Sequence, residues 1–433
     1  MTARALALDA LIRIEDGAFA HILVPELLAR SDLERRDRAF VTELVFGSVR
    51  MQRALDFQLD RHASRPLAEL EPAVRAALRL GAYQLLIGTP AHAAVAETVE
   101  AVTTRARGFV NGVLRSLARA GPPWSWPPAD TVTGIAVRTS HPDWIAQLLV
   151  DNFGVATALA TLAVNDEPAA LTLRVNRRRA TVAAVEKELL DLGLGVERGV
   201  LVPDALVVPG SGDVGALAAV REGRATPHDQ ASQAVVAALD PQPGERVLDV
   251  AAAPGGKASA SAERMDDTGL VVAADVNPGR VRLLARGLRR LGLDSIQPVV
   301  ADGRHPFVAN DTFDRVLVDA PCSGLGVLRR RPDARWRVQP ADVTTLGLLQ
   351  RELILAAAAI VRPGGRLVYA VCTVSPAETL AIDEFATERL PGFAALTPAG
   401  PPWRSHGRGA LVLPADARTD GMFVLALQRD LGG

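Results

Sequence analysis

Residues 246–257 read RVLDVAAAPGGK, and this stretch decides the fold. Its first five residues, Arg246 to Val250, form a short apolar run that predicts a buried strand. The small residues and glycines that follow predict a tight turn, and Lys257 stands where a helix is expected to begin. A strand, a glycine-rich turn and a helix in this order are typical of the first unit of an α/β sheet that binds a ligand.

The same alternation continues toward the C-terminus. We predict strands at residues 270–274, 297–301, 315–318 and 366–371, with helices at about 278–291 and 342–361. Alternating strands and helices give a parallel, doubly wound (Rossmann-like) sheet. The carboxyl ends of parallel strands meet at one edge, where ligands bind. We therefore expect the polar residues at these strand ends to share that edge: Asp249, Asp275, Asp302, Asp319 and Cys372.

The chain before residue 225 has a different pattern. Apolar residues recur three and four positions apart from Arg4 to about Ala120, which predicts an all-helical domain. Residues 121–128, GPPWSWPP, break the helix and predict a linker. Short strands at 170–175 and 205–208 predict a small α/β connecting subdomain. The predicted domains are residues 1–125, all-helical; residues 126–225, linker and connecting subdomain; and residues 226–433, the α/β domain.

Composition limits the class of protein. The 433 residues are 48% apolar and 22% charged, as in an ordinary soluble globular protein. The net charge of −1 does not by itself indicate a nucleic-acid partner. The longest apolar run near a helical pattern is shorter than the roughly 20 residues that span a bilayer. The N-terminus does not resemble a signal peptide. We therefore expect a cytoplasmic protein with no membrane contact and no metal site.

The turn after the first predicted strand fits a cofactor site, because small residues let the backbone approach a ligand and a helix start offers free N–H groups. The turn matches neither the dinucleotide fingerprint nor a Walker loop, which disfavours dinucleotides and nucleoside triphosphates. Asp275 follows this turn in the sequence at a spacing that is typical of a carboxylate that accepts both hydroxyls of a ribose. The expected cofactor-binding residues are Ala251, Ala252, Ala253, Pro254, Gly255, Gly256, Lys257, Asp275, Asp302 and Asp319.

These motifs resemble those of the Sun (NOL1/NOP2/Sun) family of RNA cytosine-5 methyltransferases. Residues 247–257 resemble the family's first motif, residues 319–324 (DAPCSG) with 325–333 its fourth, and Cys372-Thr373 its sixth. Residues 419–423 (TDGMF) resemble its closing strand. Residues 40–47 (FVTELVFG) and 109–115 (FVNGVLR) resemble a NusB-like helical domain, and residues 140–144 and 173–176 its connecting region. This combination is most similar to the bacterial 16S ribosomal RNA methyltransferases of the B type.

The resemblance implies S-adenosylmethionine as cofactor and RNA as partner, from the small ribosomal subunit, with the NusB-like domain binding RNA. It also implies that Cys372 is the nucleophile and that Cys322 assists release. Two positions depart from the family: Ala251 stands where a cysteine is common, and Val371 where a threonine often precedes the nucleophile. Since the residue at 251 is not the family's nucleophile, we expect activity to survive. We expect a monomer.

The residue types suit this chemistry. Cytosine C5 attacks a methyl group poorly unless a thiolate first adds to C6, and cysteine is the most nucleophilic ordinary side chain. Asp319 can protonate or hydrogen-bond N3 to ease that addition. Lys257 can support the flipped base or the cofactor carboxylate. The basic run Arg329 to Arg331 is a candidate for phosphate contacts, whereas His141 and His305 are expected to be structural.

Two alternatives remain open from the sequence alone. A methyltransferase acting on another substrate, such as a DNA cytosine-5 enzyme, would use the Pro-Cys cysteine, Cys322, as nucleophile. A non-catalytic RNA-binding or assembly factor could keep the fold without the reaction. The two strand-end cysteines together with Asp319 favour the enzyme, and the extra helical domain favours RNA.

Overall fold

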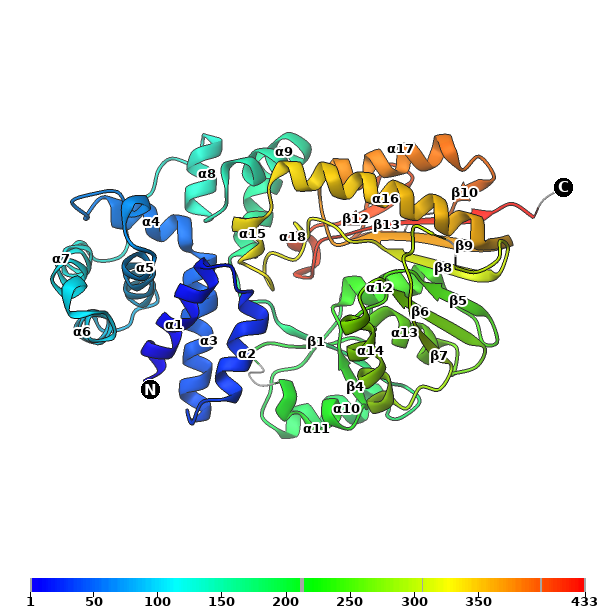
Figure 1. The fold of residues 1–433 in the computed structure, drawn as a ribbon, viewed down its shortest axis with the longest axis horizontal. Coiled ribbons are helices and arrows are strands. Elements are labelled where there is room, and N and C mark those ends of the chain that lie inside the picture. Colours follow the sequence, from blue (N-terminus) through cyan, green and yellow to red (C-terminus); the bar gives the residue numbers. More distant parts are fainter. Residues whose placement is uncertain (1, 211–213, 306, 398, 432–433) are drawn as a thin grey trace. The chain divides into compact units, whose positions relative to one another are not determined.

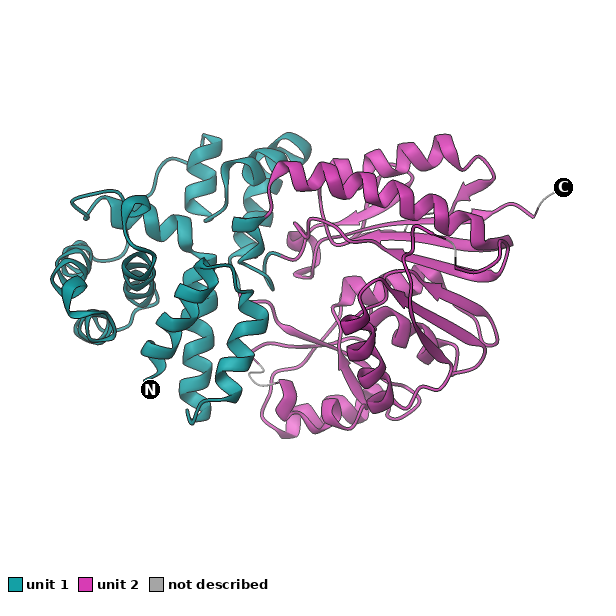
Figure 2. Ribbon diagram, viewed as in Figure 1, with its two compact units in different colours: residues 1–167, 328–337 teal, residues 168–327, 338–433 magenta. Residues whose placement is uncertain are grey.

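The computed structural model describes residues 2–210, 214–305, 307–397 and 399–431, which fold into two compact units (Figure 2). The helical unit comprises residues 1–167 and 328–337, and the sheet unit comprises residues 168–327 and 338–433. The helical unit therefore takes in a short segment that the chain supplies from the middle of the sheet unit. The domain boundaries expected near residues 125 and 225 stay predictions.

The helical unit confirms the predicted helical periodicity. Leu44, Leu55, Leu78 and Leu114, from four different helices, are fully buried in one apolar core. The seventh helix ends at Ala120, where Gly121 takes a left-handed φ of 63° that stops the helix. Its helices are α1 (Ala3–Glu15), α2 (Ala20–Ala29), α3 (Arg35–Arg50), α4 (Gln52–Asp60), α5 (Pro72–Leu86), α6 (Ala91–Ala101), α7 (Thr104–Ala120), α8 (Val132–Arg138), α9 (Asp143–Asn165) and α15 (Ala334–Arg337) (Figure 1).

The segment 328–337 is anchored in the helical unit by buried polar contacts. Arg335 is fully buried and donates to Asp166 Oδ1 at 2.8 Å and to the carbonyl of Ser140 at 3.0 Å. The indole N–H of Trp336 donates to the carbonyl of Val49 at 2.8 Å. Each contact satisfies a polar group that would otherwise be buried at a cost. The segment is therefore part of this unit's packing and not a surface loop.

The sheet unit begins with a small sheet in the order β2-β3-β1-β4, all of whose pairs are antiparallel. This confirms both strands expected in the connecting region. Leu173, Leu189 and Leu206 form the centre of its own small core. Its elements are β1 (Leu171–Val175), α10 (Val182–Asp191), β2 (Glu197–Arg198), β3 (Leu206–Val208), α11 (Ala218–Arg221) and β4 (Ala225–Pro227).

The large sheet has the strand order β11-β12-β13-β9-β8-β5-β6-β7, with β10 paired to β13. The five predicted strands, β5 to β9, form parallel pairs. Four further strands are antiparallel, so the sheet is mixed, not wholly parallel as expected. The strands are β5 (Arg246–Asp249), β6 (Leu270–Asp275), β7 (Ile296–Val300), β8 (Phe313–Asp319), β9 (Val361–Val371), β10 (Phe393–Ala395), β11 (Arg404–His406), β12 (Gly409–Val412) and β13 (Met422–Arg429).

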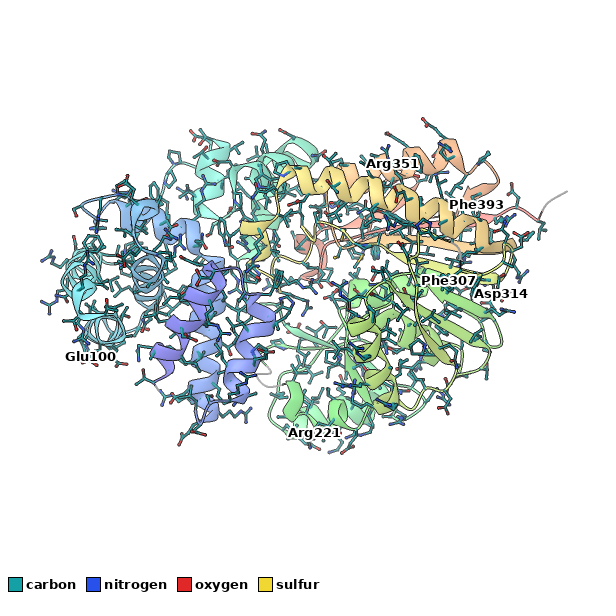
Figure 3. All side chains as sticks on the ribbon, viewed as in Figure 1. Glu100, Arg221, Phe307, Asp314, Arg351 and Phe393 are labelled. Carbon is teal, nitrogen blue, oxygen red and sulfur yellow. The ribbon has the colours of Figure 1, made fainter. Side chains whose placement is uncertain are left out.

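Helices cover both faces of this sheet (Figure 1). Leu317 of β8 packs into the core beneath one face, whereas its neighbours along the strand point to the other face, as a strand's alternation requires. α16 packs on β8 and β9, and its Arg351 lies 5.1 Å over the Phe385 ring of α17 (Figure 3). The helices are α12 (Gln230–Leu239), α13 (Gly256–Arg264), α14 (Pro278–Leu291), α16 (Pro340–Ile360), α17 (Leu380–Arg389) and α18 (Pro414–Ala417).

One helix of each unit, α9 of the helical unit and α16 of the sheet unit, is long and apolar enough to cross a membrane by length and composition alone. Each has a packing role here: α9 carries buried residues of the helical unit, and α16 covers the sheet. A buried core helix passes the same test of composition, so these two helices do not by themselves indicate a membrane protein.

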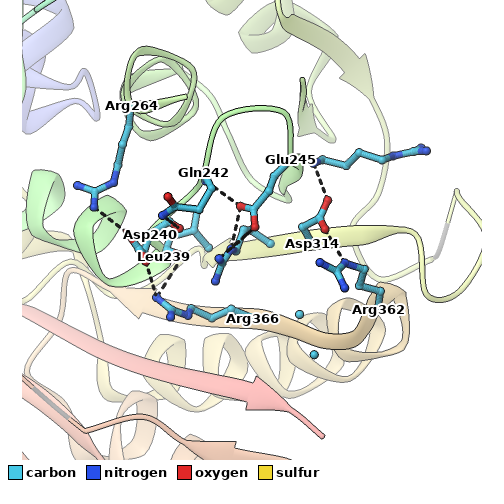
Figure 4. A network of polar contacts seen from close by, with 12 residues as sticks. Leu239, Asp240, Gln242, Glu245, Arg264, Asp314, Arg362 and Arg366 are labelled. Carbon is cyan, nitrogen blue, oxygen red and sulfur yellow. Dashed lines mark hydrogen bonds and ion pairs between the residues drawn. The ribbon is translucent and has the colours of Figure 1, made fainter. Parts of the chain in front are cut away.

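Ion pairs join the amino ends of the strands, opposite the predicted ligand edge (Figure 4). Asp240, which follows α12, accepts from Arg264 at 2.7 Å and lies 3.8 Å from Arg366 of β9. Arg362 pairs with Asp314 at 2.5 Å, which joins β9 to β8. Most of these side chains are partly exposed, so each pair contributes little alone. Together they stabilise the amino ends of the strands. The candidate ligand site lies at the opposite edge, at the carboxyl ends.

Candidate active site

The carboxyl ends of the central strands bring the predicted residues to one edge. The chain runs outward from β5 in one direction through β6 and β7, and in the other through β8 and β9, so the strand order reverses beside β5. Asp249 pairs in register with Leu317 of β8, and Asp319 pairs with Ala370 of β9. A reversal of this kind opens a crevice at the strand ends, where α/β sheets hold their ligands.

The turn between β5 and α13 is held close to the sheet. The Ala252 N–H donates to the carbonyl of Ala274 at 2.7 Å, which ties the turn to β6. Gly255 has a φ of 105°, and a Cβ there would lie 3.1 Å from Leu284, so the position favours glycine for both conformation and space. The first N–H groups of α13 are therefore available beside the strand ends.

Arg174 of β1, in the connecting subdomain, holds the start of α13 in place. Its guanidinium donates to the carbonyl of Gly256 at 2.7 Å and pairs with Glu263 at 2.9 Å. It also lies 2.8 Å from His228 Nδ1, and burial, followed by the charge of Arg174, holds the pKa of His228 well below its usual value. A neutral imidazole can accept from the arginine. The connecting subdomain thus helps to shape the cofactor turn.

The acidic residues at the edge differ in their surroundings. Asp249 is 2% exposed, and no side chain among the described residues donates to its carboxylate. Burial, with a smaller contribution from Asp319, raises the pKa of Asp249 to about 7. Asp275 is also buried, and its Oδ1 accepts from the Asn277 N–H at 2.9 Å. Asp302 pairs with Arg304 at 2.6 Å, which lowers its pKa to about 2.

These surroundings fit S-adenosylmethionine. A buried carboxylate without a side-chain partner suits a ligand that brings positive charge and N–H donors, and this cofactor carries both a sulfonium and an ammonium group. Asp275 at the end of β6 stands where a ribose can be bound. Asp302 is already paired, so a ligand there would compete with Arg304. The described residues contain no group of three or more histidine, cysteine or acidic side chains that could hold a metal ion.

The two cysteines lie side by side. Cys322 follows β8 and Cys372 follows β9, and their sulfurs are 3.4 Å apart. Beside them, the Lys257 ammonium donates to Asp319 Oδ2 at 2.6 Å. The structure therefore brings together all four predicted catalytic residues: Cys322, Cys372, Asp319 and Lys257.

The proton between the two sulfurs is held unequally. The hydrogen bond from Cys322 lowers the pKa of Cys372, and the Lys257 charge acts in the same direction. The same contact, together with burial, raises the pKa of Cys322 well above its usual value. Cys372 is thus the thiol that ionises first, and only the thiolate is a strong nucleophile. Burial would lower the pKa of Lys257, but Asp319 raises it overall, so the ammonium stays charged.

A backbone contact keeps the two cysteine loops in close packing. The Gly326 N–H donates to the carbonyl of Cys372 at 3.0 Å. A Cβ at Gly326 would lie 2.2 Å from the carbonyl oxygen of Gly421, so no other residue fits without moving the backbone. Gly421 belongs to the motif before β13, which explains how this distant motif supports the site.

Several weaker predictions have different outcomes. Of the basic run, Arg329 is 4% exposed within the helical unit and cannot reach a phosphate backbone, so that part of the prediction is wrong. Arg331 is exposed. His141 is fully buried, and burial holds its pKa well below its usual value, in agreement with a structural role. His305 is exposed.

One group of functional candidates was not predicted from the sequence. Ser323 and Thr373, the residues directly after the two cysteines, share the buried carboxylate of Glu378. A signal was present, because both cysteines are followed by a hydroxyl residue and the acid comes shortly after the second. No sequence pattern singled out Arg174, whose partners are His228, before α12, and residues of α13.

Comparisons with known proteins agree with this geometry. Residues 236–428 match a family model described as 16S rRNA methyltransferase RsmB/F. Residues 1–119 match the NusB family, and residues 141–215 match the ferredoxin-like domain of RsmF/B-like methyltransferases. The three matches follow the chain in the order in which the helical, connecting and α/β regions occur.

Individual relatives extend over the whole chain. A ribosomal RNA small subunit methyltransferase B from Vibrio cholerae is 33% identical, covering 99% of this chain and 98% of the relative. The protein of the same name from Citrobacter koseri is 34% identical, covering 98% of both. A crystal structure of a protein named PH0851 superposes with a TM-score of 0.84 at 25% identity, covering 99% of each chain. The likeness therefore includes both units.

Proposed function

Because the chain belongs to the family of 16S ribosomal RNA methyltransferases RsmB/F, we propose that it methylates C5 of a cytosine in small-subunit ribosomal RNA. Family membership makes it a methyltransferase that uses S-adenosylmethionine; the C5 position and the covalent route are the proposal. The observation that carries them is the 3.4 Å contact between Cys322 and Cys372 beside the Lys257–Asp319 pair. We further propose that it acts as a cytoplasmic monomer.

In the first step, Cys372 adds to C6 of the cytosine. Its lowered pKa supplies the thiolate, and the new S–C6 bond places negative charge on the ring. Asp319 stands beside the nucleophile, and a proton of the Lys257 ammonium that donates to it can pass through its carboxylate to N3. The target base must be unstacked to reach this edge. The bound cofactor supplies an electrophilic methyl group, which C5 then takes.

In the second step, the product must be released. C5 now carries both the methyl group and its original proton, and that proton must leave before the C5–C6 double bond can form again. We assign this step to Cys322, whose thiol proton can pass to the departing Cys372 sulfur while its own sulfur takes the C5 proton. The raised pKa of Cys322 supports this role, because it keeps the thiol protonated until then.

The helical unit has a separate proposed role. Its match to the NusB family supports the proposal that it holds RNA and presents the target base to the sheet unit. Most phosphate contacts position a nucleic acid without reading its sequence. If the helical unit has this task, its removal should weaken the binding of RNA and leave the affinity for the cofactor unchanged.

One experiment tests the proposed reaction. Small-subunit ribosomal RNA is incubated with the full chain and S-adenosylmethionine labelled in the methyl group, and its nucleosides are then separated by mass. We expect labelled 5-methylcytosine from the wild type and none from Cys372→Ala. Label in another nucleoside would contradict the C5 assignment. Absence of label from a folded, cofactor-binding wild type would favour the non-catalytic assembly factor instead.

A further inference from the structure

The residues directly after the two cysteines are joined to each other. Ser323 follows Cys322 and Thr373 follows Cys372, and both are buried, with exposed fractions of 5% and 0%. Their hydroxyl oxygens lie 2.8 Å apart. The two loops that carry the sulfurs are therefore in direct contact. Whatever fixes this contact also fixes the distance between the sulfurs.

A single buried carboxylate accepts from both loops. Glu378, in the short 3-10 helix η3 (Pro376–Glu378), is fully buried. Its Oε1 accepts from the Ser323 N–H at 2.8 Å, and its Oε2 accepts from the Ser323 hydroxyl at 2.5 Å. The Thr373 hydroxyl donates to the same Oε2 at 3.1 Å. One side chain thus joins the two cysteine loops from β8 and β9.

Gln350 of α16 connects the Glu378 carboxylate to Pro321, the residue that precedes Cys322. Its side-chain amide donates to Glu378 Oε1 at 3.1 Å and to the carbonyl of Pro321 at 2.9 Å. Both chain neighbours of Cys322, Pro321 and Ser323, are therefore held. The carbonyl of Glu378 in turn accepts from the buried Tyr369 hydroxyl at 2.8 Å, so the carboxylate's own backbone is fixed to β9.

Among the described residues, the hydrogen-bond donors to the Glu378 carboxylate are uncharged groups. They are four in number and come from Ser323, Thr373 and Gln350. A carboxylate has about four acceptor sites on two oxygens, whereas an amide has only one accepting oxygen. Burying a charge is costly unless such partners are present. A carboxylate here is therefore the group that can hold four donors from three segments at once.

We propose that Glu378 is a positioning residue that holds Cys322 and Cys372 in the relative placement needed for attack and release. Its effect on catalysis rests on the proposed function, but its effect on the distance between the sulfurs does not. Glu378 contacts the residues next to the two cysteines and acts through Ser323 and Thr373. A displacement of about 1 Å in such a site can cost on the order of a hundred-fold in rate.

The first test needs no RNA. An azodicarboxamide oxidant converts the two thiols to a disulfide, taking two electrons and two protons and becoming a hydrazine. Formation of the Cys322–Cys372 bond in the full chain is followed by mass spectrometry. We expect Glu378→Gln to form it on the order of ten-fold more slowly than the wild type, because an amide cannot hold all four donors. An unchanged rate would overturn the proposal.

Asp383→Asn is the matched control. Asp383 is a buried carboxylate on α17, and in the described part of the chain the hydrogen bonds to its carboxylate come from Arg408, at 2.7 Å, and not from either cysteine loop. We expect this variant to lose stability but to keep the wild-type rate of disulfide formation. If both variants slow the reaction equally, general loosening of the fold explains the result and Glu378 has no specific role.

The second test measures turnover. Glu378→Gln should lower kcat on the order of ten- to a hundred-fold, with KM for RNA and the cofactor Kd within about two-fold of the wild type. A change confined to KM would contradict a positioning role. If the wild type makes no 5-methylcytosine, the proposed function fails while the disulfide test still stands. Should Glu378→Gln fail to fold, Ser323→Ala combined with Thr373→Val removes two donors and must give the same slower disulfide formation.

Discussion

The ammonium of Lys257 lies 2.6 Å from the carboxylate of Asp319, although the two residues are 62 positions apart in the chain. The pair joins the start of α13 to the end of β8, and it stands beside the more acidic of the two cysteines. One contact therefore connects the cofactor turn with the site of the reaction. Loss of the pair should alter both the supply of a proton to the substrate base and the ease with which Cys372 ionises.

Replacing Lys257 should make Cys372 harder to ionise. In Lys257→Met the cation that favours the thiolate is lost, so the pKa of Cys372 should rise and its alkylation by iodoacetamide should move to higher pH. Turnover should fall by about a hundred-fold or more, because proton transfer is lost as well. Lys187→Met, at an exposed lysine on α10, is the control and should change neither. An unshifted alkylation profile in Lys257→Met would contradict this electrostatic role.

The two cysteines should give opposite results in a covalent trapping experiment. Cys372→Ala should form no protein–RNA adduct, because the bond to C6 is lost. Cys322→Ala should attack and methylate, then stall, because a group needed only after methylation cannot prevent the earlier bond. The stalled species should survive denaturing gel electrophoresis. The reverse pattern, with the adduct lost in the Cys322 variant, would make Cys322 the nucleophile, as in DNA cytosine-5 enzymes.

Asp249 should make cofactor binding depend on pH. Its folded pKa of about 7 lies above its ordinary value of 3.8, so its protonation stabilises the fold fully below pH 3.8 and this contribution is lost as pH rises through about 7. A cationic ligand prefers the ionised form, so affinity for S-adenosylmethionine should rise between about pH 6 and pH 8. Calorimetry in buffers of different ionisation enthalpy would detect the released proton. Asp249→Asn should abolish the pH dependence; if the slope persists, another group is responsible.

Asp275 should contribute strongly to cofactor affinity. If its buried carboxylate accepts both ribose hydroxyls, Asp275→Ala should weaken binding by about ten- to a hundred-fold, the usual cost of hydrogen bonds to a charged group. Isothermal calorimetry gives the Kd, and circular dichroism checks that the fold is kept. Unchanged affinity in a folded variant would contradict the assignment.

Arg335 should be important for stability although it is far along the chain from the helices that bury it. Arg335→Met leaves Asp166 buried without its cation, at a cost of about 3–5 kcal/mol. Thermal unfolding measures the loss. Arg331→Met, at an exposed arginine of the same segment, should stay within about 0.5 kcal/mol. Adding Asp166→Asn to Arg335→Met should restore part of the stability; if it does not, lost packing and not the unpaired charge explains the effect.

The strands that form the site were predictable because each is a short apolar run that ends at a polar residue. Parallel pairing then requires Asp249, Asp319 and Cys372 to meet at one edge, and they do. The antiparallel strands β10 to β12 were not predicted, since short edge strands carry a weak periodic signal. Residue types alone indicated where the chemistry would lie.

The supporting contacts could not be predicted in this way. A hydroxyl residue after each cysteine marks the loops, but the sequence does not show that Ser323 approaches the buried carboxylate of Glu378 from 55 residues away. Arg329 looked like part of an exposed basic run, whereas only 4% of it is exposed. Periodicity describes how one element faces a core, whereas these roles arise from contacts between elements.

The placement of residues 328–337 in the helical unit has a consequence for synthesis on the ribosome. The first 167 residues of that unit emerge early, but Arg335 and Trp336 emerge only after some 160 further residues have been made. At about 5–20 residues per second, this gap is roughly ten to thirty seconds. During that interval Asp166 lacks its Arg335 partner and the carbonyl of Val49 lacks its indole donor. The helical unit is therefore a nascent domain that stays unfinished until most of the sheet unit has left the exit tunnel.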